Sequence, residues 1–184
     1  MKNFLKFFEG AKKLSFPLED REELSELKYG DPVLISGWIL CGRDATHRKI
    51  LQSVERGEFS IDLKNQLFYY VGPTPAPPGK EVGSAGPTTS SRMDAYMEFM
   101  LKAGIAGSLG KGKRSKEVRE LLKKYKGIYL STFGGAGAFL SRFIKKVECL
   151  LWEDLGPEAL FRMKVEDFPA IVAIDTQGND FFEY

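Results

Sequence analysis

The sequence VLISGWILCGRDATHRKILQSV, residues 33–54, contains the pattern that decides the fold. Its first part, Val33 to Leu40, is a β-rich apolar run that predicts a strand beginning just after Pro32. A polar block at 42–47 follows, and apolar residues then recur at the spacing of one helix face, at Ile50, Leu51 and Val54. This stretch therefore predicts a strand, a loop and a helix.

The same alternation of strand and helix continues through the chain, which predicts a single α/β domain with a mixed β-sheet. Further strands are expected at 66–71, 105–109, 128–133, 147–152 and 170–175. Further helices are expected at 18–27, from Ser91 to Gly104, at 115–126, at 138–144 and from Pro157 onward. A helical turn packed on the body or on a neighbouring subunit is expected near the start, with Phe4, Leu5, Phe7 and Phe8 as its apolar residues.

Local signals place the ends of two of these helices. Ser91 with Asp94 three residues later predicts a capping box at the start of the helix that carries Met93, Tyr96, Met97, Met100 and Leu101. Ser115 is predicted to cap the next helix, and Gly127 is predicted to terminate it.

Composition excludes several classes of protein. The 184 residues include 27 Lys and Arg against 25 Asp and Glu, a net charge of +2, which is too small an excess for a typical nucleic-acid binder. No run approaches the roughly 18 apolar residues of a membrane span, and the start lacks the features of a signal peptide, so a cytoplasmic protein is expected. Two cysteines, expected to stay reduced, and one histidine are too few ligands for a self-contained zinc or iron–sulfur site.

Residues 72–91 form the least ordinary stretch. These twenty residues include five prolines and four glycines and show almost no apolar periodicity. A long loop of this kind inside a domain is usually either functional or disordered.

Three loops between a predicted strand and a predicted helix are rich in glycine and cations: 42–47, 83–92 and 110–114. Such loops gather at one edge of an α/β sheet, where helix N-termini attract anions. Arg43, Arg92 and Lys111 are then expected to converge on a small dianion, because arginine binds a carboxylate through two parallel hydrogen bonds and lysine adds a compact charge. Simpler readings stay open: an internal Arg43–Asp44 ion pair, a His47 that only satisfies its helix, and helix capping by residues 87–91.

Two partial phosphate-binding motifs offer an alternative function, a stand-alone phosphate or nucleotide-binding module. Gly107 and Gly112-Lys113 have Walker A spacing, but Arg114 stands where a magnesium-binding hydroxyl is needed. Gly135-Ala136-Gly137 follows a predicted strand, yet Leu140 replaces the small residue of a dinucleotide fingerprint, so close backbone packing explains it better.

Four blocks together resemble the β subunit of class I fumarate hydratases and L-tartrate dehydratases. They are Gly42-Arg43-Asp44-Ala45-Thr46-His47, Tyr70-Val71-Gly72-Pro73, Gly86-Pro87-Thr88-Thr89-Ser90-Ser91-Arg92-Met93-Asp94 and Gly110-Lys111-Gly112. The resemblance runs from about Leu14 to the turn at 175–178. It implies a domain at 14–184 of the swivelling β/β/α type, preceded by an extension at 1–13.

The resemblance also implies a partner α subunit that carries a 4Fe–4S cluster on three cysteines, in an assembly with two copies of each subunit. The reaction implied is the reversible hydration of fumarate to L-malate, with L(+)-tartrate dehydration as the alternative. A catalytically silent interaction subunit is a third possibility. Each of these substrates is a C4 dicarboxylate, and neither a nucleic acid nor a membrane is expected as a partner.

Site roles follow from the matching motif positions. Thr88 would remove the proton from the carbon beside the hydroxyl-bearing carbon, and Arg43, Arg92 and Lys111 would hold the carboxylates. Lys111 is preferred over Lys113 by its Gly-Lys-Gly context. Asp44, His47 and Thr89 would support these groups, and the proton donor to the leaving water would come from the other subunit.

Overall fold

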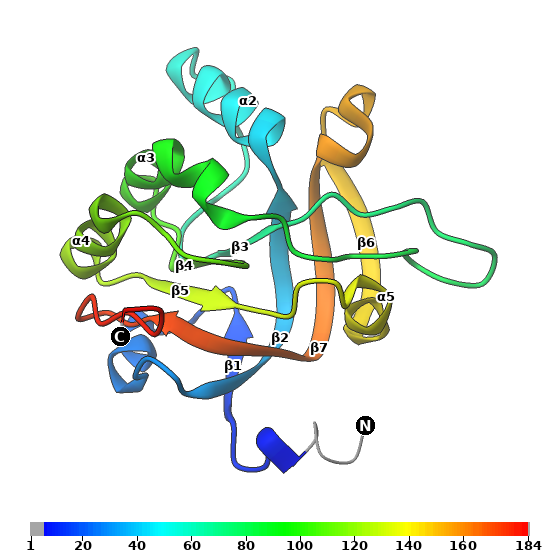
Figure 1. Ribbon diagram of the computed structural model, residues 1–184. Coiled ribbons are helices and arrows are strands. Elements are labelled where there is room, and N and C mark those ends of the chain that lie inside the picture. The colour runs from blue at the N-terminus through cyan, green and yellow to red at the C-terminus, as the bar shows by residue number, and fades with distance from the viewer. Residues whose placement is uncertain (1–5, 184) are drawn as a thin grey trace.

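Seven strands form one mixed sheet in the computed structural model, which describes residues 6–183 (Figure 1). The strands are β1 (Lys12–Phe16), β2 (Pro32–Gly42), β3 (Leu67–Tyr70), β4 (Gly107–Gly110), β5 (Ile128–Ser131), β6 (Ile144–Leu151) and β7 (Leu160–Ile174). Their order is β1-β2-β3-β4-β5-β7-β6, and β2 also pairs with β7. That extra pairing closes β2, β3, β4, β5 and β7 into a five-stranded barrel. The predicted α/β domain with a mixed sheet is therefore confirmed.

Strand direction determines which loops meet. The strands from β1 through β5 run parallel to their neighbours, whereas β7 is antiparallel to β2, β5 and β6. Consequently the carboxyl ends of β2, β3 and β4 lie at the same edge of the barrel.

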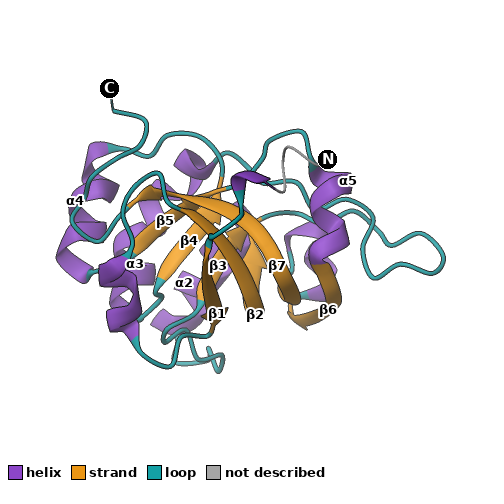
Figure 2. Cartoon of the chain, turned by 90° about the horizontal axis from the view of Figure 1, so that it is seen from below, coloured by secondary structure: helices purple, strands orange, loops and turns teal. Residues whose placement is uncertain are grey.

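Helices cover the outside of the barrel. They are η1 (Arg21–Glu26), α2 (Asp44–Glu55), η2 (Ser90–Tyr96), α3 (Met97–Lys102), α4 (Lys116–Tyr125), α5 (Gly137–Leu140), η3 (Ser141–Phe143) and η4 (Glu153–Glu158). Figure 2 shows α3 and α4 on one side of the barrel and α5 on the other. Within residues 6–183, none of the helices has the length and apolar character needed to cross a membrane.

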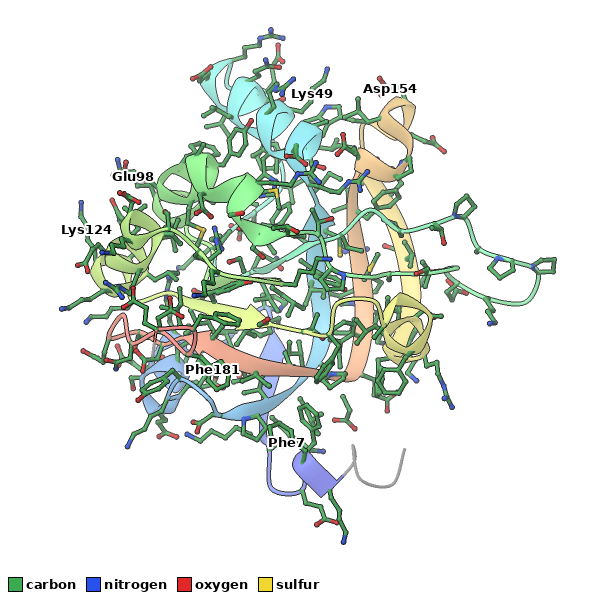
Figure 3. All side chains as sticks on the ribbon, viewed as in Figure 1. Phe7, Lys49, Glu98, Lys124, Asp154 and Phe181 are labelled. Atoms are coloured by element: carbon green, nitrogen blue, oxygen red, sulfur yellow. The ribbon has the colours of Figure 1, made fainter. Side chains whose placement is uncertain are left out.

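Strand β3 shows how this arrangement makes two cores. Leu67 and Tyr69 belong to the cluster that fills the barrel, and the alternate residues Phe68 and Tyr70 belong to the cluster under the helices. Because successive side chains point to opposite faces, all four residues of the strand are buried. Charged side chains such as Lys49, Glu98, Lys124 and Asp154 lie at the periphery (Figure 3).

Several predicted helices differ in detail. The segment after Ser91 begins as a 3-10 helix, and the carboxylate of Asp94 accepts hydrogen bonds from Arg114 and from the backbone amide of Ser115. The predicted Ser91–Asp94 capping box is therefore wrong. The Ser115 cap is confirmed, since its hydroxyl accepts from the Val118 amide. The left-handed residue that ends this helix is Lys126, with φ 53°, rather than Gly127.

The C-terminal third was predicted least well. The helix expected from Pro157 is wrong, because residues 160–174 form the long strand β7. In α2 only one of the three expected apolar contacts is fully buried: Ile50 is inaccessible, whereas Val54 is 40% exposed because the helix projects beyond the barrel (Figure 1).

The N-terminal segment is placed only in part. Strand β1 was not predicted, and it pairs with β2 from Lys12 onward. Phe8 is buried and its ring lies 6.3 Å from that of Phe133, so this part of the expected turn packs on the body. Phe4 and Leu5 lie outside the described residues.

Candidate functional site

The site predicted from the three cation-bearing loops lies at the carboxyl ends of β2, β3 and β4. Arg43 directly follows β2 and is the N-cap of α2. Thr88 lies against the end of β3, because its amide donates to the Tyr70 carbonyl at 2.7 Å. Lys111 directly follows β4.

Arg43 is held by the helix turn around it and by η4. Its Nε donates to Glu158 Oε1 at 3.0 Å, and its backbone amide donates to Thr46 Oγ1 at 2.9 Å. Gly72 leaves room for this position of Arg43, since a Cβ at residue 72 would lie 2.7 Å from the guanidinium carbon. The guanidinium of Arg43 therefore lies close to the backbone of Gly72, just after the end of β3.

Asp44 and Arg92 form a bidentate pair that connects α2 with η2. Arg92 Nε lies 3.2 Å from Asp44 Oδ1, and Nη2 lies 2.5 Å from Oδ2. The Arg43–Asp44 ion pair considered from the sequence is not formed, because each arginine has its carboxylate on another element. Half of the Arg92 side chain remains exposed, so the pair stands open to a competing anion.

His47 is completely buried beneath Arg43, with its ring packed on Phe68, Tyr70 and Tyr96. Burial lowers its pKa to about 4, so the ring is neutral at pH 7. Its Nδ1 lies 2.8 Å from the Arg43 carbonyl, and since a carbonyl only accepts, Nδ1 carries the proton and donates it. His47 thus fixes the backbone that carries Arg43, and its Nε2 has no hydrogen-bond partner among residues 6–183.

The loop that contains Thr88 is bound along the ends of two strands. Pro87 pairs with Val71 in an antiparallel bridge, and Thr89 pairs with Lys111 in a parallel one. The bridge places Thr89 beside Lys111, where it supports the loop. Residues 87–89 therefore have a role beyond capping a helix.

Lys111 and Lys113 differ in their surroundings. Lys111 is half-buried, with its side chain beside Gly134, whereas Lys113 is exposed. This geometry places Lys111 at the same barrel edge as Thr88 and leaves Lys113 in solvent.

The partial phosphate motifs have structural explanations. Gly107 lies inside β4, paired with both neighbouring strands, so it does not begin a phosphate-binding loop. At Gly137 a Cβ would lie 2.8 Å from the Gly86 amide, and the Ala85 amide donates to the Gly137 carbonyl. The second motif marks a close backbone approach that fixes the base of the loop at 72–91.

Sequence reasoning missed three groups that support this site: Glu158, Ser90 and the buried Arg114. Glu158 lies within the predicted but unformed helix after Pro157, which gave no indication of a contact with Arg43. Arg114 appeared only as a mismatch to the Walker motif. Its partners are far apart in sequence, so nothing local identified it.

Metal ligands are scarce around the site. Residues 6–183 contain no group of three or more His, Cys, Asp or Glu side chains able to hold a metal ion. Cys41 is buried in β2, and burial raises the pKa of its thiol; Cys149 is exposed on β6, where partial desolvation and the nearby Glu153 carboxylate raise its thiol pKa. The arrangement is instead suited to binding an anion: three cations from three loops, two of them paired with carboxylates that an anionic ligand can replace.

Comparison with known proteins adds a family. The family model described as "Fumarase C-terminus" matches residues 9–184. The chain is 41% identical over 165 residues to "Fumarate hydratase 2" of Leishmania major, covering 88% of this chain and 29% of that protein. It is 40% identical to "Fumarate hydratase class I, aerobic" of Salmonella typhimurium, covering 88% of this chain and 28% of the relative.

A third relative is nearly the same length as this chain. "Putative L(+)-tartrate dehydratase subunit beta" of Methanocaldococcus jannaschii is 35% identical over 174 residues, covering 89% of this chain and 87% of that protein. The chain therefore spans under a third of the fumarate hydratases but most of the archaeal subunit.

Proposed function

Since the chain belongs to the fumarase C-terminus family of hydro-lyases, we propose that it is the β subunit of an iron–sulfur enzyme that reversibly hydrates fumarate to L-malate. The observation that carries the proposal is the placement of Arg43, Lys111 and the Thr88 loop at the ends of three adjacent parallel strands, with Arg92 joined to this edge through Asp44. Arg43, Arg92 and Lys111 carry three positive charges against the two carboxylates of Glu158 and Asp44, and this net positive charge favours an anionic substrate.

In this proposal the two arginines hold the substrate carboxylates and Lys111 adds a third positive charge. Carboxylate–arginine hydrogen bonds are charge-assisted and directional, so they fix the substrate relative to Thr88. The same groups stabilise the negative charge that develops as the carbon–hydrogen bond breaks.

Thr88 is proposed as the base in the dehydration direction. The proton leaves the carbon beside the hydroxyl-bearing carbon and moves to the Thr88 oxygen, while the hydroxyl departs as water with a proton supplied by the partner chain. An ordinary threonine hydroxyl is a weak base. Nearby cations favour its alkoxide form, which is the reason to place Thr88 among them.

The 4Fe–4S cluster implied by class I fumarate hydratases does not fit this chain. Its two cysteines lie on different strands: Cys41 is buried in β2 and Cys149 is exposed on β6. Within residues 6–183, no group of three His, Cys, Asp or Glu side chains is placed to hold a metal. We therefore place the cluster on a partner α subunit. The name of the archaeal relative, a subunit beta of comparable length, supports this division.

The test is reconstitution with the partner subunit under anaerobic conditions, followed by assays of fumarate, malate and tartrate turnover. Thr88→Ala and Arg92→Ala are expected to abolish most of the turnover, whereas the exposed neighbour change Lys113→Ala keeps it. Full turnover in both site variants would refute the assignment. Cluster content measured by iron analysis should be the same in all three variants, which separates loss of chemistry from loss of assembly.

L(+)-tartrate dehydration is the second candidate, favoured by the 87% coverage of the archaeal subunit. Both substrates present two carboxylates to the same cations, so this chain's site serves either one. Comparing kcat/KM for malate and tartrate in the reconstituted enzyme decides between them.

A further inference from the structure

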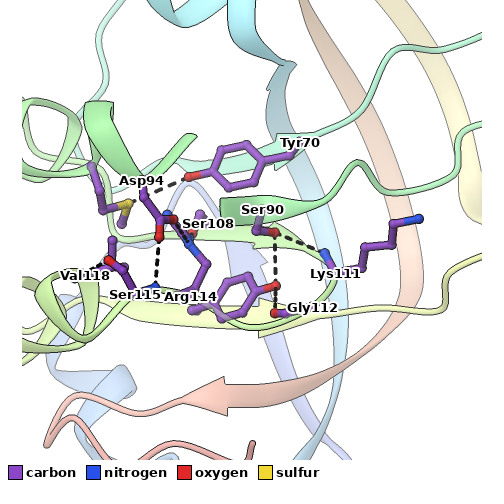
Figure 4. Close-up of polar contacts among 11 residues, drawn as sticks. Tyr70, Ser90, Asp94, Ser108, Lys111, Gly112, Arg114, Ser115 and Val118 are labelled. Atoms are coloured by element: carbon purple, nitrogen blue, oxygen red, sulfur yellow. Dashed lines mark hydrogen bonds and ion pairs between the residues drawn. The ribbon is translucent and has the colours of Figure 1, made fainter. Parts of the chain in front are cut away.

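A buried arginine, Arg114, lies between Asp94 of η2 and Ser108 of β4 (Figure 4). The side chain of Arg114 has no exposed surface, and its Nε donates to Asp94 Oδ1 at 2.6 Å while Nη1 donates to Ser108 Oγ at 3.0 Å. Its guanidinium carbon lies 5.4 Å from the centre of the Tyr70 ring and 5.0 Å from that of Tyr129. One cation therefore contacts residues of β3, β4, β5 and η2.

A chain of hydroxyls connects this cluster to Lys111. The Tyr129 hydroxyl lies 2.8 Å from the Gly112 carbonyl oxygen and 3.0 Å from Ser90 Oγ. Burial raises the pKa of Tyr129 to about 12, so it keeps its single proton, which must go to the carbonyl because a carbonyl only accepts. Ser90 then donates to Tyr129 and accepts the Lys111 amide at 3.0 Å.

The backbone at these positions is shaped to admit the cluster. A Cβ at Gly110 would lie 2.0 Å from Ser90 Oγ, so only glycine leaves room for the Ser90 side chain at the end of β4. Asp94 uses its second oxygen to accept the Ser115 amide at 2.8 Å, which joins η2 to the start of α4. These buried contacts join the loop that carries Thr88 to the loop that carries Lys111.

An ion pair at this depth is an expensive way to obtain stability alone. Burying a charge costs several kcal/mol, and well-packed apolar residues often replace such pairs without loss. Arg114 Nη2 is also left without a hydrogen-bond partner among residues 6–183. The planar guanidinium instead fixes the geometry of its neighbours. It donates two directed hydrogen bonds and lies over the rings of Tyr70 and Tyr129.

We propose that Arg114 is a positioning residue, which acts with Tyr129 and Ser90 to fix Lys111 relative to Thr88 and Arg92. This inference rests on the proposed function, because it assigns to the network the task of holding that site in register. Arg114, Tyr129 and Ser90 are all buried. Their effect reaches the site through the Lys111 backbone and through η2.

Two variants test the network in the enzyme assembled with its partner subunit. Tyr129→Phe removes one hydroxyl and keeps the ring, and Arg114→Lys keeps the charge but loses the fork. Each is expected to lower kcat by about tenfold or more, the scale expected when reacting groups are displaced by a fraction of an ångström. In Tyr129→Phe, hydrogen exchange should accelerate at residues 86–92 and 110–113 and remain unchanged in β7.

The matched controls are Tyr125→Phe and Arg119→Lys, the same substitutions at two positions of α4 outside the network. Ile35→Val, inside the barrel, supplies a variant that is destabilised without touching the network. The positioning role is refuted if kcat depends on stability alone. That would be the case if Ile35→Val and Tyr129→Phe, at equal Tm, lost the same fraction of kcat. Wild-type kcat and wild-type exchange in Tyr129→Phe and Arg114→Lys refute it as well.

The design also separates this inference from the proposed function. Loss of turnover in Arg92→Ala together with wild-type behaviour of Tyr129→Phe and Arg114→Lys overturns the network and leaves the proposed function standing. Wild-type turnover in Arg92→Ala overturns the proposed function. Faster exchange at Lys111 in Tyr129→Phe then still supports the network as the device that fixes the two loops.

Discussion

Replacing Gly72 with alanine should disable Arg43 while leaving the fold almost as stable as before. A Cβ at this position would lie 2.7 Å from the Arg43 guanidinium carbon, 2.9 Å from Nε and 3.0 Å from Nη1. Ordinary contact begins at 3.4 Å, so the guanidinium has to move by at least about 0.7 Å. A flexible side chain can make that shift, but only by giving up its position beside Glu158.

The expected change in stability is small because two effects oppose each other. Gly72 is not among the glycines with positive φ, so alanine fits the backbone and stabilises by about 0.4–1 kcal/mol through the unfolded chain. Loss of the partly exposed Arg43–Glu158 pair costs about 0–1 kcal/mol. The free energy of unfolding should therefore change by less than about 1 kcal/mol.

The expected change in substrate affinity is much larger. A hydrogen bond to a charged group contributes about 1.5–3 kcal/mol. Losing one such contact to a substrate carboxylate lowers kcat/KM by about 10-fold to 150-fold, at roughly 1.4 kcal/mol per factor of ten. The assays are urea denaturation of the chain and steady-state kinetics of the reconstituted enzyme.

A double-mutant cycle makes the reasoning strict. If Gly72→Ala acts only through Arg43, the variant Gly72→Ala/Arg43→Ala should be no worse than Arg43→Ala alone. Wild-type kcat/KM in Gly72→Ala beside a strong loss in Arg43→Ala would refute the packing argument. So would a loss of more than about 3 kcal/mol in the free energy of unfolding, since that magnitude belongs to a disrupted core.

Three further predictions concern the surroundings of the site. Asp44→Asn should leave Tm nearly unchanged and lower KM severalfold, measured in the reconstituted enzyme, because a neutral amide releases Arg92 to a substrate carboxylate more readily than the Asp44 carboxylate does. The unfolded chain protonates His47 below about pH 6.5 and the folded chain only below about 4, so the free energy of unfolding should fall by at most about 3 kcal/mol as the pH drops through that window. Urea denaturation at several pH values should show that this share of the fall is absent in His47→Gln. In the loop, hydrogen exchange should be fast at the exposed tip, at the amides of Ala76, Gly79 and Glu81, and slow at the bonded amides of Ala85, Thr88 and Ser90. Equal exchange rates in the two groups would contradict this.

The part of the site that follows from local rules could be predicted from the sequence. A strand ending in Gly42, a polar loop and an amphipathic helix place Arg43 at a helix start, and parallel strands bring such loops to one edge. The same logic located the loops of Arg92 and Lys111. The common edge of these loops needs only strand direction, which the alternation of elements indicated.

Only the last part of β7, predicted as a strand at 170–175, could be recognised in this way, and its first half could not. Its buried residues in the first half, Leu160, Met163, Val165 and Phe168, mix spacings of two and three, so the period favours neither strand nor helix. Asp167, with φ 49°, interrupts the regular pattern near a register shift against β2. The strand exists because it pairs with β2, β5 and β6, contacts that no local window contains.

Arg114 was hidden for the same physical reason. Its partners Tyr70, Asp94 and Tyr129 come from three elements that meet only after the barrel has closed. The sequence motif around it, Gly-Lys-Gly-Lys-Arg, resembles a solvated basic loop. In the structure the Arg114 side chain is instead buried, and its charge is paired with Asp94 and hydrogen-bonded to Ser108.

The two arginines of the site are prepared for a ligand to different degrees. Arg43 is held through Nε alone, by Glu158, so among the described residues both of its terminal nitrogens are left for a carboxylate. Arg92 is held through Nε and Nη2 by both oxygens of Asp44, and a substrate carboxylate has to exchange with that pair. Preorganised contacts cost less on binding than contacts that must first be broken. Arg43 should therefore contribute more to the affinity for the first carboxylate, and Arg92 should engage as η2 and α2 adjust around the second.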